Sequence, residues 1–351
     1  MLKTFECPVC KKNHWKPIET YSYSKEDGEK CKYTKYTPAL RKLKLILRAL
    51  LIGKPRKHIV SNSSLSSYQK LRREVIFNVW FKNKTEIELK SIFCTTCGFT
   101  CYTPRPEDKD IADKYEYLKQ YKSVQVGQTG YDSYVKKMDR KRATRIYEQC
   151  AKYFTSEQLD VLDYGGRDGK ILIPFQDNHH RCHIIDYYDR PIDGILKLGD
   201  DINNCKIEKK FDVIICSHVL EHVSDISHLI RKLKELLKPD GIIYAEVPQQ
   251  IWAGLRIEAD PVTHINFFTT NSFVNLFLSN GFFILDKHQG IYNYGTLYIR
   301  AIWLVAQNKN KNTTKLLPAD TEAMLYPSRL YSIKNIFGLL IVPKLLKLIK
   351  R

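Results

Sequence analysis

The sequence predicts an α/β protein built on a doubly wound sheet of seven strands with an antiparallel last hairpin, beside a smaller N-terminal module. Short apolar runs alternate with helical patterns between about residues 156 and 280, which favours parallel strands with helices on both faces. Two long apolar segments follow, at 282–288 and 294–306, and the turn between them holds Gly and Asn. They predict the antiparallel pair at the end of the sheet.

Each element has a local signal in the chain. We expect strands at 160–164, 183–187, 194–198, 211–217 and 241–247, and helices at 168–177, 225–238 and 270–279. The last helix opens at Thr270 or Asn271 and closes at Asn280 and Gly281. Another helical stretch, rich in Lys and Arg, covers about 132–154 and precedes the first of these strands.

The turn after the first strand predicts a ligand site. An apolar run that ends in Asp163 and Tyr164 meets the glycine-rich stretch 165–169, which leads into a helix. Strand, glycine-rich turn and helix in this order place a ligand at the carboxyl edge of a parallel sheet, and the glycines let the backbone approach it closely. A plain connection between a strand and a helix looks the same, so the other motifs decide.

The chain length of 351 residues suits two domains, or one large domain with an appendage. The segment 103–106, Thr-Pro-Arg-Pro, marks a boundary. We expect a module at 1–106 with a basic insertion at about 20–90, a helical connector at 107–155, the α/β domain at 156–307 and a basic amphipathic tail at 308–351.

The composition limits the classes of protein and partner. An apolar fraction of 43% and an aromatic fraction of 12% exclude a disordered chain. The formal net charge of +19 favours an anionic partner, namely nucleic acid, membrane headgroups or a phosphorylated substrate, although a merely Lys-rich composition explains it too. The first residues do not resemble a signal peptide, and the ten cysteines do not resemble a secreted disulfide framework. We therefore expect a cytoplasmic protein.

Two Cys-x-x-Cys motifs, within 5–10 and 93–98, predict a zinc site in the N-terminal module. The expected ligands are Cys7, Cys10, Cys94 and Cys97, with Cys31, Cys101 and His14 as less favoured substitutes. Two short turns with two thiolates each supply the tetrahedral sulfur set that Zn²⁺ prefers. The gap between the motifs is longer than in compact zinc modules. A redox pair is the rival, but neither motif opens a helix after a strand.

Two segments combine apolar residues with cations. Residues 39–52 have helical spacing and lie within a stretch, 30–73, that has no Asp or Glu. Residues 336–351 are similar in composition. Either segment could lie on an anionic bilayer, where each Lys or Arg near the surface adds about 1 kcal/mol, or could pack on its own protein. We favour a peripheral contact with the inner membrane face.

Four separated motifs carry a family resemblance. They are Val-Leu-Asp-Tyr-Gly-Gly-Arg-Asp-Gly at 161–169, His-Ile-Ile-Asp at 183–186, the run from Phe211 to Val223, and the run from Leu237 to Pro248. Together they resemble the class I S-adenosylmethionine-dependent methyltransferases, which have a Rossmann-like fold. The resemblance covers residues from about 156 to 307.

The resemblance implies a set of contacts to S-adenosylmethionine. The implied residues are Asp163, Gly165, Gly166, Gly169, Asp186, Asp200, Ser217 and His218. Among them, Asp186 would accept hydrogen bonds from the ribose hydroxyls. Arg167 is a departure, because most relatives have Gly there. We expect its side chain to point outward, since the sulfonium of the cofactor is itself cationic. An inward Arg167 would instead indicate an inactive relative.

The two Cys-x-x-Cys motifs and the segment 264–269, His-Ile-Asn-Phe-Phe-Thr, are similar to a subgroup of this family. Its members resemble sugar C-methyltransferases and the methyltransferases of bacterial surface-polysaccharide gene clusters. The implied function is methyl transfer to a sugar, small or lipid-linked, in polysaccharide biosynthesis. An RNA methyltransferase is an alternative, but the basic segment lacks interleaved aromatic residues, so a nucleic acid partner is disfavoured. A catalytically inactive zinc-bearing relative is the third reading.

Three residues are candidates for catalysis. In-line alignment supplies most of the rate of methyl transfer, and a general base removes the proton of the nucleophile. His264 lies on the loop after the strand at 241–247 and is the preferred base, while His222 and Glu221 begin the helix after the strand at 211–217. A purely structural His264 is nearly as well supported, and Glu221 also suits the first turn of a helix.

Overall fold

The computed structural model describes residues 5–25, 28–30, 67–122, 129–249, 262–294, 297–309 and 315–320. The two predicted basic segments, 39–52 and 336–351, lie outside these residues, as does Cys31. None of the helices in the described ranges is long and apolar enough to cross a membrane.

The N-terminal module is a five-stranded sheet with the order β10-β4-β3-β1-β2. Its strands are β1 (Trp15–Ser24), β2 (Gly28–Lys30), β3 (Glu86–Cys94), β4 (Thr100–Thr103) and the short β10 (Asn266–Phe267). β1 and β3 are antiparallel, from Trp15 opposite Cys94 to Ser24 opposite Glu86. The predicted insertion at 20–90 is therefore too wide, because both of its ends belong to paired strands. This pairing also explains how two distant Cys-x-x-Cys motifs meet.

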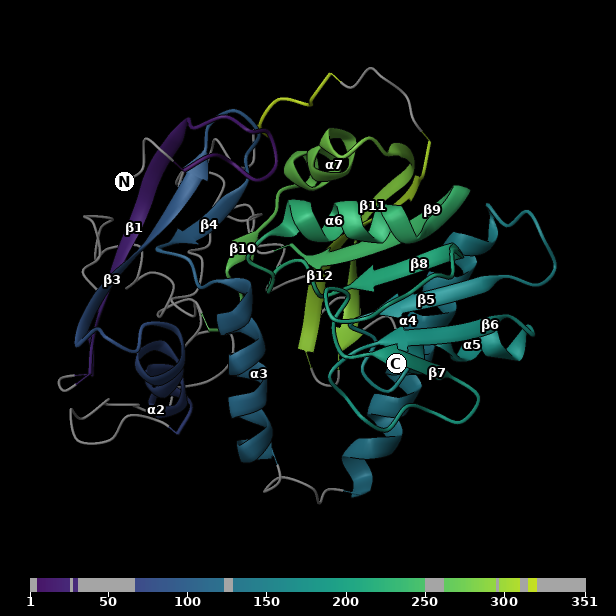
Figure 1. Ribbon diagram of the computed structural model, residues 1–351, viewed down its shortest axis with the longest axis horizontal. Coiled ribbons are helices and arrows are strands. Elements are labelled where there is room, and N and C mark those ends of the chain that lie inside the picture. Colours follow the sequence, from purple (N-terminus) through teal and green to yellow (C-terminus); the bar gives the residue numbers. More distant parts are fainter. Residues whose placement is uncertain are drawn as a thin grey trace, which may run out of the picture.

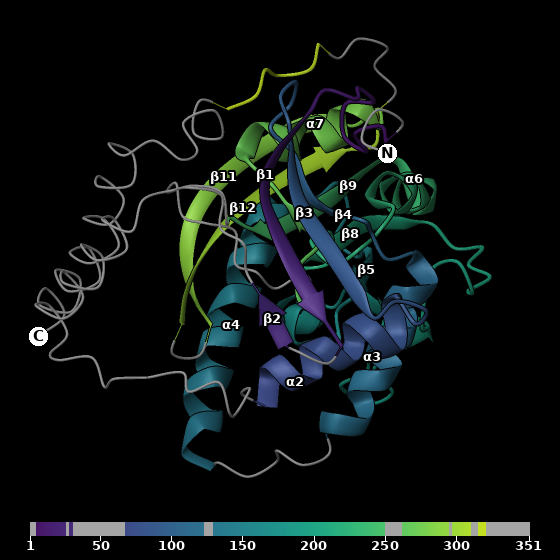
Figure 2. The same ribbon diagram turned by 90° about the vertical axis from the view of Figure 1, so that its left-hand side faces the viewer.

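The sequence analysis did not find the helical layer on this sheet. α2 (Ser67–Glu74) continues into the π-helix η1 (Val75–Trp80), and Val75, Ile76 and Phe77 are buried. They belong to one apolar cluster with residues of β1, β3 and β4. In Figure 2 this sheet faces the viewer, with α2 and α3 (Asp108–Lys122) near the ends of β1 and β3. Because this apolar run is buried, it attaches the C-terminal end of the basic stretch 30–73 to the N-terminal sheet.

The main sheet has seven strands with the order β11-β12-β9-β8-β5-β6-β7, which confirms the predicted fold. Its strands are β5 (Asp160–Tyr164), β6 (Arg181–Ile185), β7 (Leu196–Gly199), β8 (Phe211–Ser217), β9 (Leu237–Pro248), β11 (Phe283–Tyr294) and β12 (Leu297–Gln307). The pairs among β5 to β9 are parallel, whereas β12 is antiparallel to both β9 and β11. The strand order reverses at β5, which is where open α/β sheets bind ligands.

Two predicted boundaries were wrong for identifiable reasons. The helix expected at 168–177 begins late, as a 3₁₀ turn η2 (Lys170–Leu172) followed by α5 (Ile173–Asp177) with Pro174 in its first turn. The expected turn near Gly290 is part of β11, whose last residue is Tyr294. A Cβ at Gly290 would lie 2.4 Å from the Trp303 ring, so this glycine makes room for a cross-strand tryptophan.

Helices cover both faces of the main sheet (Figure 1). α6 (Ile226–Leu236) and α7 (Thr270–Ser279) pack on one face, and α4 (Thr129–Ala151) and α5 pack on the other. The cluster under α6 and α7 also contains the four cysteines of the two motifs. The N-terminal module therefore shares a core with the α/β domain.

β10 joins the two sheets. It follows β9 in the chain but pairs with β4, where Asn266 lies opposite Cys101 and Phe267 opposite Thr100. α3 lies at the same junction, between the N-terminal sheet and the main sheet (Figure 1). The segment just before β10, which contains His264, is thus held between the two modules.

Candidate active site

The loop after β5 depends on glycine because its backbone passes very close to other atoms. A Cβ at Gly166 would lie 2.3 Å from Oδ2 of Asp163, and one at Gly165 would lie 2.4 Å from the Val219 side chain. Gly165 and Gly169 also have positive φ values of 74° and 84°. These contacts confirm that the glycine-rich turn is a tight loop at the carboxyl end of β5.

Asp163 lies beneath this loop with one oxygen unsatisfied. Its side chain is buried, and Oδ2 has no hydrogen-bond partner in the described structure. Burial raises the pKa of Asp163 to about 8; Arg142 opposes this rise, and Asp186 and Asp168 add to it. A buried oxygen without a partner indicates a place for a ligand group.

Asp186, at the end of β6, shapes the same loop. Its Oδ2 accepts the Arg167 N–H at 2.9 Å, and its Oδ1 accepts the Tyr188 N–H at 2.8 Å. The Arg167 side chain is exposed, and its guanidinium lies 5.5 Å from the centre of the Tyr188 ring. This geometry agrees with the expected outward orientation of Arg167.

Asp200, a predicted contact of the cofactor, lies at the surface. Its side chain is 59% exposed and forms an ion pair with Lys197 at 2.5 Å. The neighbouring Asp201 accepts a hydrogen bond of 3.3 Å from the hydroxyl of Tyr187, the residue that follows Asp186. Asp201 is therefore the acid of this pair that is bonded to the segment after β6.

Ser217 and His218, two further predicted contacts of the cofactor, bond to a buried carboxylate, Glu246 of β9. Glu246 is fully buried. Its partners are Arg142 at 3.0 Å, Tyr244 at 2.8 Å, Ser217 at 3.2 Å, His218 at 3.2 Å and Arg145. Burial raises the pKa of Glu246, but Arg142, His218 and Arg145 outweigh burial and hold it well below its usual range.

This network ties α4 to β8 and β9, directly beneath the site. Sequence reasoning missed Arg142, Arg145 and Glu246. The one available signal was an acid inside the apolar strand Ile-Ile-Tyr-Ala-Glu-Val, since a charge in a buried strand needs a partner.

Glu246→Leu is expected to lower the free energy of unfolding by about 3–5 kcal/mol, because it leaves two partly buried guanidinium groups without their buried carboxylate. Urea unfolding measures the loss, and Glu235→Leu, at a 65% exposed acid, is the control. The pKa of Glu246 is lower in the folded protein, so its contribution is complete above the unfolded pKa and is lost as the pH falls. The difference between wild type and variant should shrink below about pH 4.5. A difference under 1 kcal/mol at pH 7 would contradict this role.

The three residues proposed for catalysis come together at the end of β8. Glu221 is 1% exposed, and its Oε1 lies 3.1 Å from Nδ1 of His218 and 3.8 Å from Nε2 of His222. Its Oε2 has no hydrogen-bond partner among the described residues. The rings of His222 and His264 are 4.8 Å apart, centre to centre. One carboxylate and two imidazoles thus share one corner of the site.

The electrostatics of this corner separate the roles of its histidines. Burial raises the pKa of Glu221, but His218, His222 and His264 lower it to about 2, so Glu221 is ionised. Burial lowers the pKa of His222 to about 3, with Lys114 and His264 also lowering it and Glu221 opposing. Burial also lowers the pKa of His218, but Glu221 and Glu246 outweigh burial and raise it overall. Near neutral pH, His222 is therefore neutral.

α3 contributes two residues that sequence reasoning missed. Lys114 is buried, and its Nζ lies 4.4 Å from the ring centre of Tyr115. The Tyr115 ring stacks on Tyr187 at 6.1 Å. Burial raises the pKa of Tyr115 above its usual range, and Glu221 and Asp186 add to the rise. Tyr115 therefore lies within electrostatic reach of both acids, one on each side of the site.

The four cysteines of the two motifs form a compact group of sulfur atoms. Sγ of Cys7 lies 3.6 Å from that of Cys97, and Sγ of Cys10 lies 3.5 Å from that of Cys94. All four are buried, and the sulfur atoms lie within 4.8 Å of one another. Zn–S bonds of about 2.3 Å in a tetrahedron place sulfur atoms about 3.8 Å apart, and a disulfide places them near 2.0 Å. The group has the spacing of a metal site.

Glu221, His222 and His264 also place potential ligand atoms within 4.8 Å of one another. The positive charge of the buried Lys114 ammonium already lowers the pKa of His222, and the same charge would repel a metal cation bound at this corner. We therefore assign no metal to this corner.

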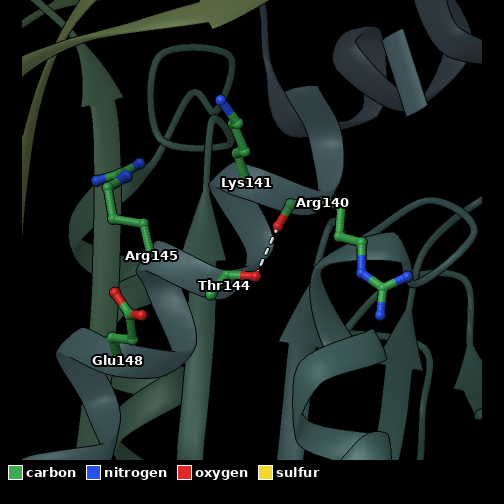
Figure 3. Close-up of a pocket in the computed structure, with 5 residues that line it drawn as sticks. All are labelled: Arg140, Lys141, Thr144, Arg145 and Glu148. Carbon is green, nitrogen blue, oxygen red and sulfur yellow. Dashed lines mark hydrogen bonds between the residues drawn. The ribbon is translucent and has the colours of Figure 1, made fainter. Parts of the chain in front are cut away.

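A separate pocket of about 340 Å³ lies on the outer side of α4 (Figure 3). Its lining residues are Arg140, Lys141, Thr144, Arg145 and Glu148. In Figure 3 the Thr144 hydroxyl donates to the Arg140 carbonyl, at 2.9 Å. Arg145 is its one link to the Glu246 network, and none of the predicted site residues lines it. The chemistry therefore lies elsewhere.

Comparison with known proteins identifies the α/β part. Residues 134–287 match the family model of a methyltransferase domain. Residues 134–287 are an S-adenosylmethionine-dependent methyltransferase domain. The matched range contains both sides of the site. One side is the glycine loop with Asp163 and Asp186, and the other is the corner of Glu221, His222 and His264.

Similar curated proteins match parts of the methyltransferase domain. A ubiquinone biosynthesis O-methyltransferase of Rickettsia canadensis (strain McKiel) is 28% identical over 113 residues, which are 29% of this chain and 48% of the relative. A malonyl-[acyl-carrier protein] O-methyltransferase of Calditerrivibrio nitroreducens is 31% identical over 110 residues, 30% of this chain and 45% of the relative. The chain spans about half the length of these relatives.

Solved structures resemble the methyltransferase domain more distantly. The 1,6-didemethyltoxoflavin-N1-methyltransferase of Burkholderia thailandensis has a TM-score of 0.42 at 16% identity, covering 56% of this chain and 89% of its own. The magnesium protoporphyrin IX methyltransferase of Synechocystis PCC 6803 has a TM-score of 0.41 at 15% identity, covering 57% and 97%. Similarity at this level does not bear on the function of this chain.

Proposed function

We propose that this protein transfers a methyl group from S-adenosylmethionine to a sugar, small or lipid-linked, used in surface polysaccharide synthesis. The observation that carries the proposal is the pairing of two groups at one sheet edge. The glycine loop with Asp163 and Asp186 lies on one side, and the corner of Glu221, His222 and His264 lies on the other. One group suits a cofactor, and the other suits an acceptor that must lose a proton.

The residues of the loop fit the cofactor. The unsatisfied Oδ2 of Asp163 offers a polar contact for it, and Gly165 and Gly166 let the loop pack tightly against Val219 and Asp163. Asp186 keeps lone pairs for ribose hydroxyls beside the two backbone N–H groups that it accepts. The bound cofactor would supply an activated methyl group, so the protein need only align the acceptor and remove its proton.

On the acceptor side, His264 is the preferred base, and the neutral His222 lies beside it, with the two ring centres 4.8 Å apart. Glu221 is ionised and stabilises an imidazolium formed beside it. Tyr115 and Lys114 of α3 cover this side and limit its exposure to water. The chain's own residues thus bind, align and deprotonate.

Asp186→Ala is expected to weaken binding of S-adenosylmethionine by about 1.5–3 kcal/mol for each hydrogen bond lost to the carboxylate. Isothermal titration calorimetry measures the affinity. Asp193→Ala, at an exposed acid eight residues from β6, is the control. Unchanged affinity in Asp186→Ala would move the ribose contact to another residue.

The acceptor class is tested by offering several acceptors with S-adenosyl-[methyl-³H]methionine. We expect label in nucleotide-linked or lipid-linked sugars. Label in a catechol or another phenol would favour the activity named for the curated O-methyltransferases and would overturn the sugar proposal. Label in RNA would do the same in favour of the nucleic acid alternative. No label in any acceptor, with cofactor bound, would favour an inactive relative.

We also propose that the four-cysteine group holds one Zn²⁺. The spacing of the sulfur atoms and their burial support this proposal. The proposed location, a peripheral contact with the inner membrane face through 39–52 and 336–351, rests on the charge and pattern of those segments alone.

A further inference from the structure

Lys114 of α3 is a buried cation in a place that needs an explanation. It is 3% exposed, and its Nζ donates to the Val262 carbonyl at 3.1 Å. The same ammonium lies 5.9 Å from the Trp80 ring and closer to that of Tyr115. Lysine is rarely buried, because removing an ammonium from water is costly.

The Val262 carbonyl opens the loop 262–266, which leads to β10 and is bonded repeatedly to the acceptor corner. The backbone carbonyl of Glu221 accepts the N–H groups of Ile265 at 2.9 Å and Asn266 at 3.1 Å. The Thr263 carbonyl bonds Nδ1 of His222. Lys114 therefore holds, from the side of α3, the same loop that carries His264 and orients His222.

The bond to Thr263 defines the state of His222. A carbonyl only accepts, so Nδ1 carries the proton and Nε2 has a free lone pair when the ring is neutral. That lone pair lies 3.8 Å from Oε1 of Glu221, which is also an acceptor. A carboxylate this close would ordinarily promote protonation of the ring.

The charged and titratable groups around His222 come from three elements. Glu221 and His218 belong to the same segment as His222, after β8. His264 lies on the loop 262–266, and Lys114 lies on α3 together with Tyr115, which is close enough to Glu221 to be affected by its charge. Glu221 favours the protonated ring, whereas Lys114 and His264 oppose it. Lys114 thus supplies a fixed positive charge, which makes a second one on His222 unfavourable.

We propose that Lys114 is a positioning residue of the acceptor side, which anchors the loop 262–266 through the Val262 carbonyl and supplies a positive charge that opposes protonation of His222, so that Nε2 of His222 stays free. This inference rests on the proposed methyl transfer and narrows its substrate. Nε2 of His222, on a side chain that is 21% exposed, is a hydrogen-bond acceptor, so the matching substrate brings a hydroxyl donor, as a sugar does.

The test is an NMR titration of ¹⁵N-labelled histidine side chains in the full chain, with the His222 signal assigned by its loss in His222→Asn. In Lys114→Met the pKa of His222 should rise by about one to two units, because one elementary charge is removed at short range. Lys114→Gln retains a donor for Val262 and should raise the pKa while Nδ1 keeps the proton. Lys109→Met, at an exposed lysine of the same helix, should leave the pKa unchanged.

The outcomes separate this inference from the proposed function. An unchanged pKa of His222 in both Lys114→Met and Lys114→Gln would overturn the inference, as would an equal shift in Lys109→Met. If Lys114→Met does not fold, by circular dichroism, Lys114→Gln decides. Failure of the wild type to bind S-adenosylmethionine would instead overturn the proposed function, and the titration of His222 does not depend on that binding.

Discussion

Cys94→Ser is expected to unfold the N-terminal sheet and to loosen the acceptor corner with it. Cys94 ends β3, lies opposite Trp15 of β1 and has its sulfur 3.5 Å from that of Cys10. Structural Zn²⁺ contributes about 10–16 kcal/mol of apparent binding free energy in small zinc modules, and loss of one thiolate removes most of it. This is the largest effect on stability that we expect for a single substitution in this chain.

The damage should extend beyond the module, because β10 pairs with β4 and directly follows the loop that contains His264. Elemental analysis should find one zinc per chain in the wild type and less in Cys94→Ser, and hydrogen exchange should show loss of protection in β1, β3 and the loop 262–266. Cys205→Ser, at a cysteine outside the group, is the control. Wild-type protein prepared without chelators that contains no stoichiometric metal would contradict the zinc proposal.

His264→Ala is expected to lower kcat by roughly 10²–10⁴, the usual loss when a general base is removed. His264 lies on the loop between β9 and β10, with its ring 4.8 Å from that of His222, on the acceptor side. The affinity for S-adenosylmethionine should change little, because the cofactor residues lie on β5 and β6. An acceptor carbon next to a ketone should depend on the base more than a hydroxyl does.

Turnover is measured with the acceptor found in the labelling experiment, and cofactor affinity by calorimetry. His179→Asn, at an exposed histidine with a positive φ of 63° that Asn tolerates, is the matched control. Normal turnover in His264→Ala would assign the proton transfer to His222 alone. A variant that loses cofactor affinity as well would give His264 a structural role.

The main sheet was predictable because its signals are local. Each parallel strand is a short apolar run followed by a turn residue or a cap, so the glycine loop, Asp186 and the start of α6 could be placed from sequence alone. The final hairpin was also predictable, because its two apolar segments are long. The sequence pattern predicts a turn near Gly290, whereas this glycine lies within β11. Its real partner, Trp303, lies across the strand and could not be inferred from neighbouring residues.

The acceptor side was predictable only in part, because it depends on contacts between distant segments. Lys114 lies on the same face of α3 as Ile111, Tyr115 and Leu118, which pack in the apolar cluster of the N-terminal sheet, but a lysine on that face gives no sequence signal of its own burial. The Arg142–Glu246 pair joins residues 104 positions apart. The family resemblance implies that Ser217 and His218 contact the cofactor, but it gives no sign of their bonds to the buried carboxylate Glu246 on the neighbouring strand.

The central claim, that the glycine loop and Asp186 bind S-adenosylmethionine, is tested most directly by mass spectrometry of small molecules released from the freshly purified native protein, followed by calorimetric titration with the cofactor. We predict that S-adenosylmethionine or S-adenosylhomocysteine is released from the wild type, that titration shows one site per chain, and that both signals weaken in Asp186→Ala. Absence of both molecules, together with no heat of binding on titration of the zinc-loaded wild type, would contradict the account.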